Sequence, residues 1–185
     1  MPLFKVSYHG TTSTDIAKWH IFVNQTDIVG TTTQEFTMNI LSTTENPRTA
    51  KDKFAPGSIG SFLIAIEPRD TQVSIRYDIS IGSLPITNKT IKLSAVKNAD
   101  TDTELTRTGE NIYTGLILLG DRMDTSNVID ENYMANIEIT YEWVNDETNN
   151  TVDTNMGLFT WLTVTAPISV TVSQYMTGET IDPYI

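Results

Sequence analysis

Two histidines are the side chains of this sequence best suited to proton transfer or metal binding. His9 and His20 lie eleven residues apart. The HExxH pattern, which places two zinc ligands on one helix face, is absent. His20 follows Trp19 in an alternating segment, so its side chain is expected on the surface, opposite the core. The histidines therefore predict no zinc site.

Carboxylates are the second group of side chains that could act in catalysis or metal binding. Glu138 and Glu142 share one face of a predicted strand, and glycoside hydrolysis needs two carboxylates across one bond. That face is the solvent side of a well-alternating segment, which favours a solvated row. Two irregular acidic clusters offer oxygen ligands for calcium but lack EF-hand spacing, so ordinary acidic loops are expected. The clusters are Asp121, Asp124, Asp130 and Glu131, and Asp146, Glu147 and Asp153.

Composition narrows the function classes further. The chain has no cysteine, which excludes disulfides, thiolate metal sites and cysteine nucleophiles. It also lacks a GxSxG elbow, a P-loop and a GxGxxG fingerprint. Its net charge of −11 argues against nucleic acid and anionic membranes as partners. No apolar run approaches the ~18 residues of a membrane span. We expect no catalysis, no metal and no cofactor.

Three Asn-x-Thr patterns match the acceptor for N-glycosylation, at Asn24, Asn88 and Asn149. A chain this rich in Asn and Thr produces the pattern by chance, so we assign it no role.

The strongest structural signal lies between residues 54 and 81. Pro56 and Gly57 suit the corner of a turn, and an apolar strand follows to Ile66. From Val73 to Ile81 every odd position is apolar and every even one polar, which fixes the register of a second strand. The short link Glu67–Asp70 predicts that the two strands form a hairpin.

Further strands and turn signals predict an antiparallel β-sandwich. A short helix is expected only within Gly120–Glu131, and Asn98–Glu110 and Asn145–Gly157 are expected to be loops. Gly115 is expected to mark a bulge. We divide the chain into an N-terminal arm (1–14), a β-sandwich domain (15–174) and a C-terminal tail (175–185). The other predicted strands are Asp15–Asn24, Gln34–Leu41, Thr90–Val96, Asn111–Leu119, Asn132–Val144, Leu158–Val164 and Ile168–Ser173.

The N-terminal arm carries a short alternating segment before a polar linker. Leu3, Phe4, Val6 and Tyr8 are its apolar positions. Such a segment is either an ordinary first strand or a strand lent to the open sheet edge of a neighbouring subunit. The arm lacks signal-peptide anatomy, so we expect a mature or engineered form, or a protein not exported by that route.

Four stretches, taken in order, resemble the TasA/camelysin family of secreted Gram-positive proteins. The run from Phe54 to Phe62 is similar to the family's APGxxGSF turn and strand, with Pro56 and Gly57 as its turn signature. The strand from Thr71 to Ile81 is followed by the Leu84-Pro85 break. The remaining stretches are Ala17–Asn24, and Ile139–Trp143 with the acidic loop to Thr154 and the ending Ile168–Val172.

This resemblance implies an all-β, antiparallel jelly-roll-like β-sandwich with little helix. It also implies a structural subunit of an extracellular filament, of the surface-fibre or biofilm-matrix type. In fibre-forming relatives the N-terminal segment inserts as a strand into the next subunit, which assigns Leu3, Phe4, Val6 and Tyr8 as the donor strand. The partner would be a second copy of the chain. The metalloprotease annotation of some members does not transfer, because no zinc site is recognisable here. The alternative is a phage virion structural protein, as a tail or capsid-decorating subunit with a β-sandwich fold.

Overall fold

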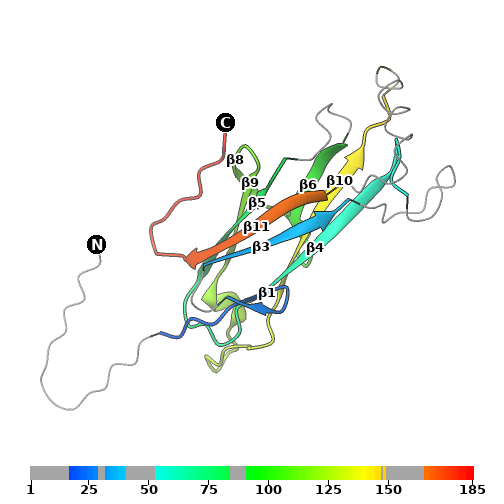
Figure 1. Cartoon of the computed structure of the whole chain (residues 1–185). Coiled ribbons are helices and arrows are strands. Elements are labelled where there is room, and N and C mark those ends of the chain that lie inside the picture. Colours follow the sequence, from blue (N-terminus) through cyan, green and yellow to red (C-terminus); the bar gives the residue numbers. More distant parts are fainter. Residues whose placement is uncertain (1–16, 29–31, 41–52, 84–90, 147, 149–164) are drawn as a thin grey trace, which may run out of the picture.

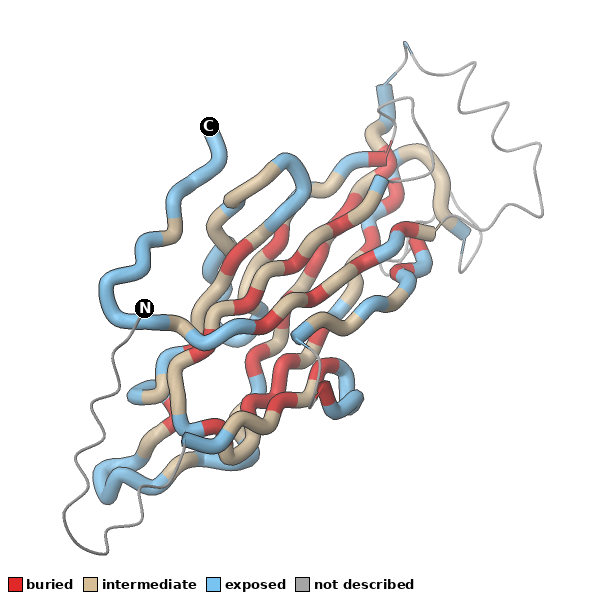
Figure 2. Tube along the Cα trace, turned by 60° about the vertical axis from the view of Figure 1, so that its left-hand side comes forward, coloured by how far each residue is buried: buried red, intermediate tan, exposed pale blue. Residues whose placement is uncertain are grey.

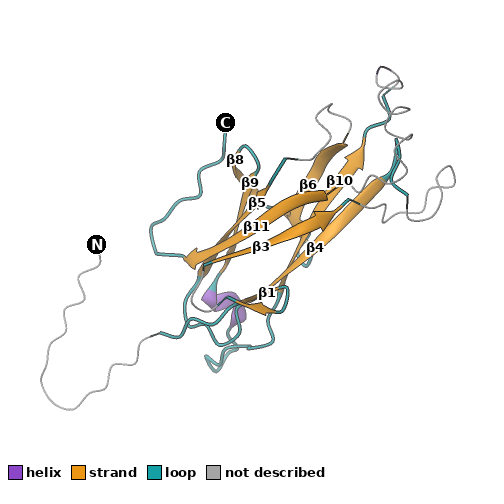
Figure 3. Ribbon diagram, in the orientation of Figure 1, coloured by secondary structure: helices purple, strands orange, loops and turns teal. Residues whose placement is uncertain are grey.

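The computed structural model describes residues 17–28, 32–40, 53–83, 91–146, 148 and 165–185. Within these residues the chain forms two antiparallel sheets packed face to face, with one short 3₁₀ helix (Figure 3). The predicted segments Leu3–Tyr8 and Leu158–Val164 lie outside the described residues. No helix among the described residues is long and apolar enough to cross a membrane.

The first sheet has the strand order β2-β1-β4-β10-β6-β7 and the second β3-β11-β5-β9-β8 (Figure 1). The bounds are β1 Phe22–Val23, β2 Thr26–Asp27, β3 Thr33–Asn39, β4 Ile59–Glu67, β5 Ile75–Ile81, β6 Ile91–Asn98, β7 Thr103–Glu104, β8 Thr106–Gly109, β9 Ile112–Ile117, the 3₁₀ helix η1 Leu119–Arg122, β10 Ala135–Trp143 and β11 Thr165–Gln174.

The connections between the sheets make this sandwich a jelly roll. From β3 onward the chain alternates between the sheets: β3 lies in the second sheet, β4 in the first, β5 in the second and β6 in the first. The strand β7 then joins the first sheet beside β6, β8 and β9 join the second sheet, β10 joins the first and β11 the second. The result is two interleaved four-strand orders, β4-β10-β6-β7 and β3-β11-β5-β9, as in the double Greek key of jelly rolls.

The core lies between the sheets and follows the sequence alternation. In β10 every odd residue from Ala135 to Trp143 is buried, and every even residue is only partly buried (Figure 2). The same pattern runs through β5 from Ile75 to Ile81. Because successive strand residues point to opposite faces, each strand gives one face to the core and one to solvent. The predicted all-β fold is confirmed.

The hairpin predicted at Glu67–Asp70 is wrong. The strands on either side of this link, β4 and β5, belong to different sheets. The link therefore arches across the end of the sandwich. Each strand has one apolar face, and this face reaches the core whether the two strands are neighbours in one sheet or lie in opposite sheets. A short link favours neighbouring positions, but it does not decide between pairing in one sheet and crossing to the other.

The strand predicted over Asp15–Asn24 is much shorter in the structure. Only Phe22 and Val23 pair as a strand, and the chain then turns through Asn24 and Gln25, whose φ angles are +47° and +65°. Two central residues with positive φ are typical of the tight hairpin turn that joins β1 to β2. Residues 18–20 instead bond to the arch between β4 and β5.

The loop predicted over Asn98–Glu110 contains two strands, β7 and β8. Between them Leu105 crosses from the first sheet to the second, and its N–H donates to the carbonyl of Val96 (2.9 Å). Gly115 does not mark a bulge. It faces the Tyr77 ring, and an added Cβ would lie 2.2 Å from that ring. The helix expected within Gly120–Glu131 is present as η1, begins one residue earlier and ends at Arg122.

Candidate strand-acceptor side of the sandwich

The two long sides of the sandwich differ. On one side the chain passes from β7 through Leu105 to β8, so a continuous crossing joins the two sheets. On the other side lie β3, at the edge of the second sheet, and β4, which among the described residues has only the two-residue strands β1 and β2 beyond it (Figure 1). We call this the β3/β4 side. Strand edges left here are where an additional strand would pair.

The register of the second sheet shows which main-chain groups of β3 face outward. The N–H of Gly82 donates to Pro167 (2.8 Å), so odd residues of β11 direct their main-chain groups toward β5. The N–H of Val172 donates to the carbonyl of Thr32 (2.7 Å), so even residues of β11 bond to β3. Because odd residues of β3 stand opposite odd residues of β11, their N–H and C=O groups point out of the sheet.

Glu35 and Thr37 are the central outward-facing residues of β3. Both side chains are exposed on the outer face. The carbonyl of Glu35 accepts a bond from its neighbour, the Gln34 side-chain amide (3.2 Å). Thr37 stands opposite Pro167, and its N–H and C=O have no partner within the described residues. This part of β3 is thus an open sheet edge.

The strand β1 pairs with one end of β4. Phe22 and Val23 pair with Glu67 and Ile66. Asn24 extends this pairing by one residue, because its N–H donates to the carbonyl of Ala65 (2.9 Å) and its Oδ1 accepts from the N–H of Ala65 (2.8 Å).

Beyond Asn24 the chain turns away from β4. The next outward-facing residue, Leu63, has 59% of its surface exposed. An exposed leucine beside an incomplete strand edge is apolar surface that a further strand would cover.

Two aromatic rings line the seam between β3 and β4. Phe36 stacks on Phe62, with ring centroids 5.8 Å apart and planes inclined by 28°. Both are only partly buried and pack against the core. The seam is therefore apolar on its inner side, and on its outer side it is bordered by the outward-facing main-chain groups of β3. An inserted strand with alternating apolar side chains needs both features.

The predicted turn at Pro56 and Gly57 starts β4. Gly57 has φ +84°, and the N–H of Ser58 donates to the carbonyl of Ala55 (2.8 Å). Proline before a positive-φ glycine is the pattern of a type II turn. The N–H of Gly57 also donates to the carbonyl of Trp143 (2.8 Å), which fixes the start of β4 to the end of β10. The turn thus sets the register of the strand that forms one half of the β3/β4 side.

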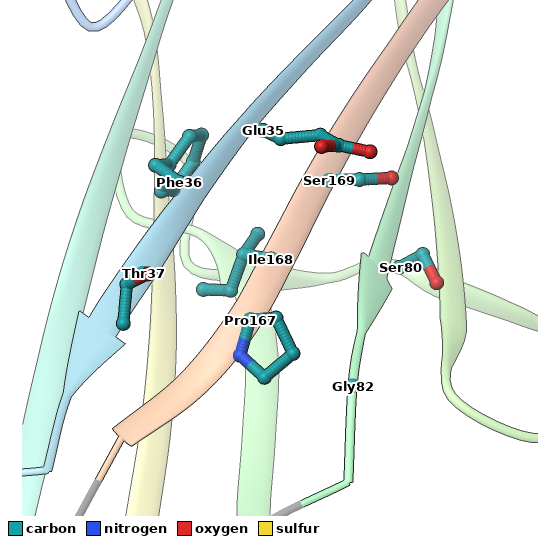
Figure 4. A pocket seen from close by; sticks show the side chains of 8 residues that line it. All are labelled: Glu35, Phe36, Thr37, Ser80, Gly82, Pro167, Ile168 and Ser169. Atoms are coloured by element: carbon teal, nitrogen blue, oxygen red, sulfur yellow. The ribbon is translucent and has the colours of Figure 1, made fainter.

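A shallow groove lies on the outer face of the second sheet, next to the β3 edge (Figure 4). It has a volume of about 470 Å³. Glu35, Ser169 and Ser80 form one cross-strand row along it. In the next row Gly82 leaves space beside the Pro167 ring, because a Cβ there would lie 2.4 Å from that ring. The groove borders the open edge and exposes the Glu35 carboxylate there.

His20 takes part in structural contacts at the end of the sandwich. Its Nδ1 lies 3.1 Å from Oδ1 of Asp70, and its Nε2 lies 3.5 Å from Oδ2 of Asp27. Because these carboxylates lie on opposite sides of the ring, they do not form a shared ligand set with it. A hydrogen bond from Lys18 holds the pKa of Asp70 below its ordinary value, and burial opposes this shift. The buried Thr71 hydroxyl donates to the carbonyl of His20 (2.9 Å) and accepts from its N–H (2.8 Å).

Arg122, which is 1% exposed at the end of η1, is a structural residue that the sequence analysis did not single out. One guanidinium nitrogen donates to the carbonyls of Thr71 (2.8 Å) and Val73 (3.1 Å), and the other to that of Arg69 (3.4 Å). Burial lowers the pKa of Arg122. The side chain therefore holds the arch between β4 and β5 in shape. A lone arginine in an acidic loop offers no pattern by which to predict this.

Two carboxylates of the first acidic cluster, Asp124 and Asp130, have main-chain hydrogen-bond partners. Asp124 accepts from the N–H groups of Ser126 (2.8 Å) and Val128 (2.9 Å). Asp130 accepts from the N–H of Asn132 (2.9 Å). These bonds are typical of turns closed by an aspartate. Among the described residues, no group of three or more His, Cys, Asp or Glu side chains is placed to hold a metal ion.

The predicted pair of glutamates also lies in an ordinary surface row. Glu138 lies 3.6 Å from Lys97, whose Nζ also lies 2.7 Å from Asp102. Asn24, the one described acceptor pattern for glycosylation, uses its side-chain oxygen to bond to Ala65.

Comparisons with protein-family models, curated proteins and solved structures found no match to this chain. The resemblance to the TasA/camelysin family stays a prediction. The predicted donor residues, Leu3, Phe4, Val6 and Tyr8, lie outside the described residues.

Proposed function

We propose that this protein is a structural subunit of an extracellular filament, assembled by donation of the N-terminal strand of one copy to the β3/β4 side of the next. The open edge of β3 is the observation that carries the proposal. Thr37 presents both main-chain groups outward, and no described residue pairs with them. Native proteins usually cover such an edge, and main-chain pairing with a second copy is one way to do so.

The chemistry of the edge fits the N-terminal arm. The segment from Leu3 to Tyr8 is six residues long and β3 is seven, so the two match in length. The arm carries Lys5 and no acidic residue, whereas β3 carries Glu35 as its one charged residue. The alternating Phe4, Val6 and Tyr8 suit the apolar seam beside the Phe36 and Phe62 rings.

Donation of this kind is a head-to-tail contact. The donor segment and the acceptor edge are different surfaces, so each copy can give one strand and receive one. Such a contact does not close on itself and produces a filament. The proposal assigns the chain no catalytic role, no cofactor and no nucleic-acid partner, and it places the filament at the cell surface or in an extracellular matrix.

Negative-stain microscopy tests the proposal on three versions of the protein. The full chain is expected to form filaments, and a version lacking Met1–Gly10 is expected to stay monomeric. Thr37→Pro in the full chain is also expected to stay monomeric, because proline removes the outward N–H without touching the bonds to β11. Thr37→Ala, which keeps that N–H, is the matched control and should form filaments. Monomers of the full chain, or filaments of all versions alike, would refute strand donation. The alternative role in a virion would then be the better explanation.

A further inference from the structure

The C-terminal tail crosses to the opposite edge of the second sheet. It leaves β11 at Tyr175, whose N–H donates to the carbonyl of Ser74 (2.9 Å). Its far end reaches β8, where the N–H of Tyr184 donates to the carbonyl of Arg107 (2.7 Å; Figure 1). The tail therefore bonds to the main chain of an edge strand.

The bonded carbonyl is one that an added strand would use. Arg107 stands opposite Tyr113 on β9, and its carbonyl points away from β9 toward the tail. The Arg107 guanidinium donates to the carbonyls of Gly109 (3.1 Å) and Glu110 (2.5 Å), which holds it over its own turn. Its central carbon lies 5.2 Å from the centroid of the Tyr184 ring. Ring and main chain of Tyr184 thus cover the edge together.

The two edges of the second sheet therefore differ in whether their outward main-chain groups are bonded. The β3 edge is open at Thr37, and the β8 edge is closed at Arg107 by the chain's own tail. Neighbouring strands of this five-stranded sheet are all antiparallel, so β3 and β8 run in the same direction. Main-chain direction alone would therefore not tell an incoming strand which edge to use.

We propose that residues 175–185 act as a strap that closes the β8 edge and directs the N-terminal strand of a second copy to β3. This inference rests on the proposed function. Charge points the same way, because the arm carries Lys5, β3 carries Glu35 and β8 carries Arg107. The strap holds β8 by one main-chain bond and one ring contact, and Tyr184 is 52% exposed. Its removal would therefore open a second acceptor edge.

Cysteine cross-linking tests this directly, because the natural chain has no cysteine. Ser7→Cys marks the donor, Thr37→Cys marks β3 and Thr106→Cys marks β8. The Ser7 variant is isotopically labelled and mixed with either acceptor variant, and a short thiol cross-linker is added. Mass spectrometry then identifies products that join a labelled to an unlabelled chain.

With the tail intact, the labelled chain is expected to link to Thr37→Cys and not to Thr106→Cys. With Tyr184→Ala added to the acceptor chain, or with residues 175–185 deleted from it, the link to Thr106→Cys is expected to rise at least several-fold. Melting curves confirm that each variant is folded. Tyr175→Ala, at the other end of the tail, controls for a general effect of removing a ring.

The outcomes separate the two proposals. A link to Thr37→Cys without any gain at Thr106→Cys on release of Tyr184 would overturn the strap and leave strand donation standing. Equal links to both positions with the tail intact would also overturn the strap. No mixed product at either position, with or without the tail, would overturn strand donation and the strap with it.

Discussion

The ring of Phe36 on β3 stacks on the ring of Phe62 on β4, with centroids 5.8 Å apart, and so joins the two sheets at the β3/β4 side. Each ring is half-buried, so truncation removes less than a full core contact. Phe62→Ala is expected to lower the free energy of unfolding by about 2 kcal/mol. Urea denaturation followed by tryptophan fluorescence measures this change.

Phe62→Leu is the matched control. It keeps most of the apolar volume and loses the ring pair, so its cost is expected to be less than half that of Phe62→Ala. Equal costs for the two variants would show that the aromatic pairing, and not buried volume, dominates at this seam. A cost near zero for both would mean that the seam does not stabilise the sandwich.

The second prediction concerns Arg122. Arg122→Met removes the donor shared by two carbonyls, and it leaves the buried carbonyl of Thr71 and the partly buried carbonyl of Val73 without that bond. Unsatisfied buried groups each cost about 1–3 kcal/mol, so the expected loss in the free energy of unfolding is about 3 kcal/mol. Chemical denaturation of wild type and variant at one pH measures it.

Arg107→Met is the control for this experiment. Arg107 also donates to main-chain carbonyls, but it does so at the exposed end of a hairpin. Its substitution is expected to cost about 0.5 kcal/mol or less, because water replaces the lost donor. If both variants lost stability equally, burial at Arg122 would not be the reason for its effect.

The strands that the sequence predicts well are those with one buried face. In β10, Ile137, Ile139 and Tyr141 alternate with polar residues, and the structure buries each of the three. Burial of one face leaves only one acceptable register, so the alternating pattern predicts both the strand and its inward-facing residues. The all-β class follows from several such strands.

What the sequence did not predict depends on contacts between distant residues. The link after Glu67 crosses between sheets, and Arg122, about fifty positions later, stabilises that arch. Similarly, Lys18–His20 alternates like a strand but bonds to Thr71 and Gln72 across the arch. A local pattern cannot show which remote partner a segment will meet. The open edge of β3 is also a property of strand order, which the pattern of one segment does not contain.

The third prediction concerns pH. The pKa of Asp70 is lowered from 3.8, first by the hydrogen bond from Lys18, with the bond from His20 contributing in the same direction. A carboxyl with a lowered native pKa stabilises the fold above its unfolded pKa, and this contribution disappears as the pH falls through the native value. Stability is therefore expected to decrease as the pH falls below about 4.

Asp70→Asn tests the assignment. The variant is expected to be less stable than wild type at pH 7, and the difference between the two should shrink toward pH 2. Denaturant midpoints measured across this range give the comparison. Asp182→Asn is the control, since Asp182 is exposed in the tail and has no hydrogen bond or ion pair within the described residues. A constant difference between the Asp70 variant and wild type at all pH values would contradict the assignment.

The last prediction follows from the approach of Gly115 to Tyr77. A Cβ on residue 115 would lie 2.2 Å from the ring carbon and the hydroxyl of Tyr77, which is 2% exposed. Gly115→Ala is therefore expected to lower the free energy of unfolding by about 2–3 kcal/mol through overpacking. Gly120→Ala, whose Cβ would meet nothing within 4 Å, should cost less than about 1 kcal/mol.

A double-mutant cycle with Tyr77→Leu isolates the cause, because a smaller side chain at residue 77 gives the new methyl group room. The cost of Gly115→Ala should then fall by more than half in the Tyr77→Leu background, and an unchanged cost would mean that the glycine is needed for its backbone and not for the ring.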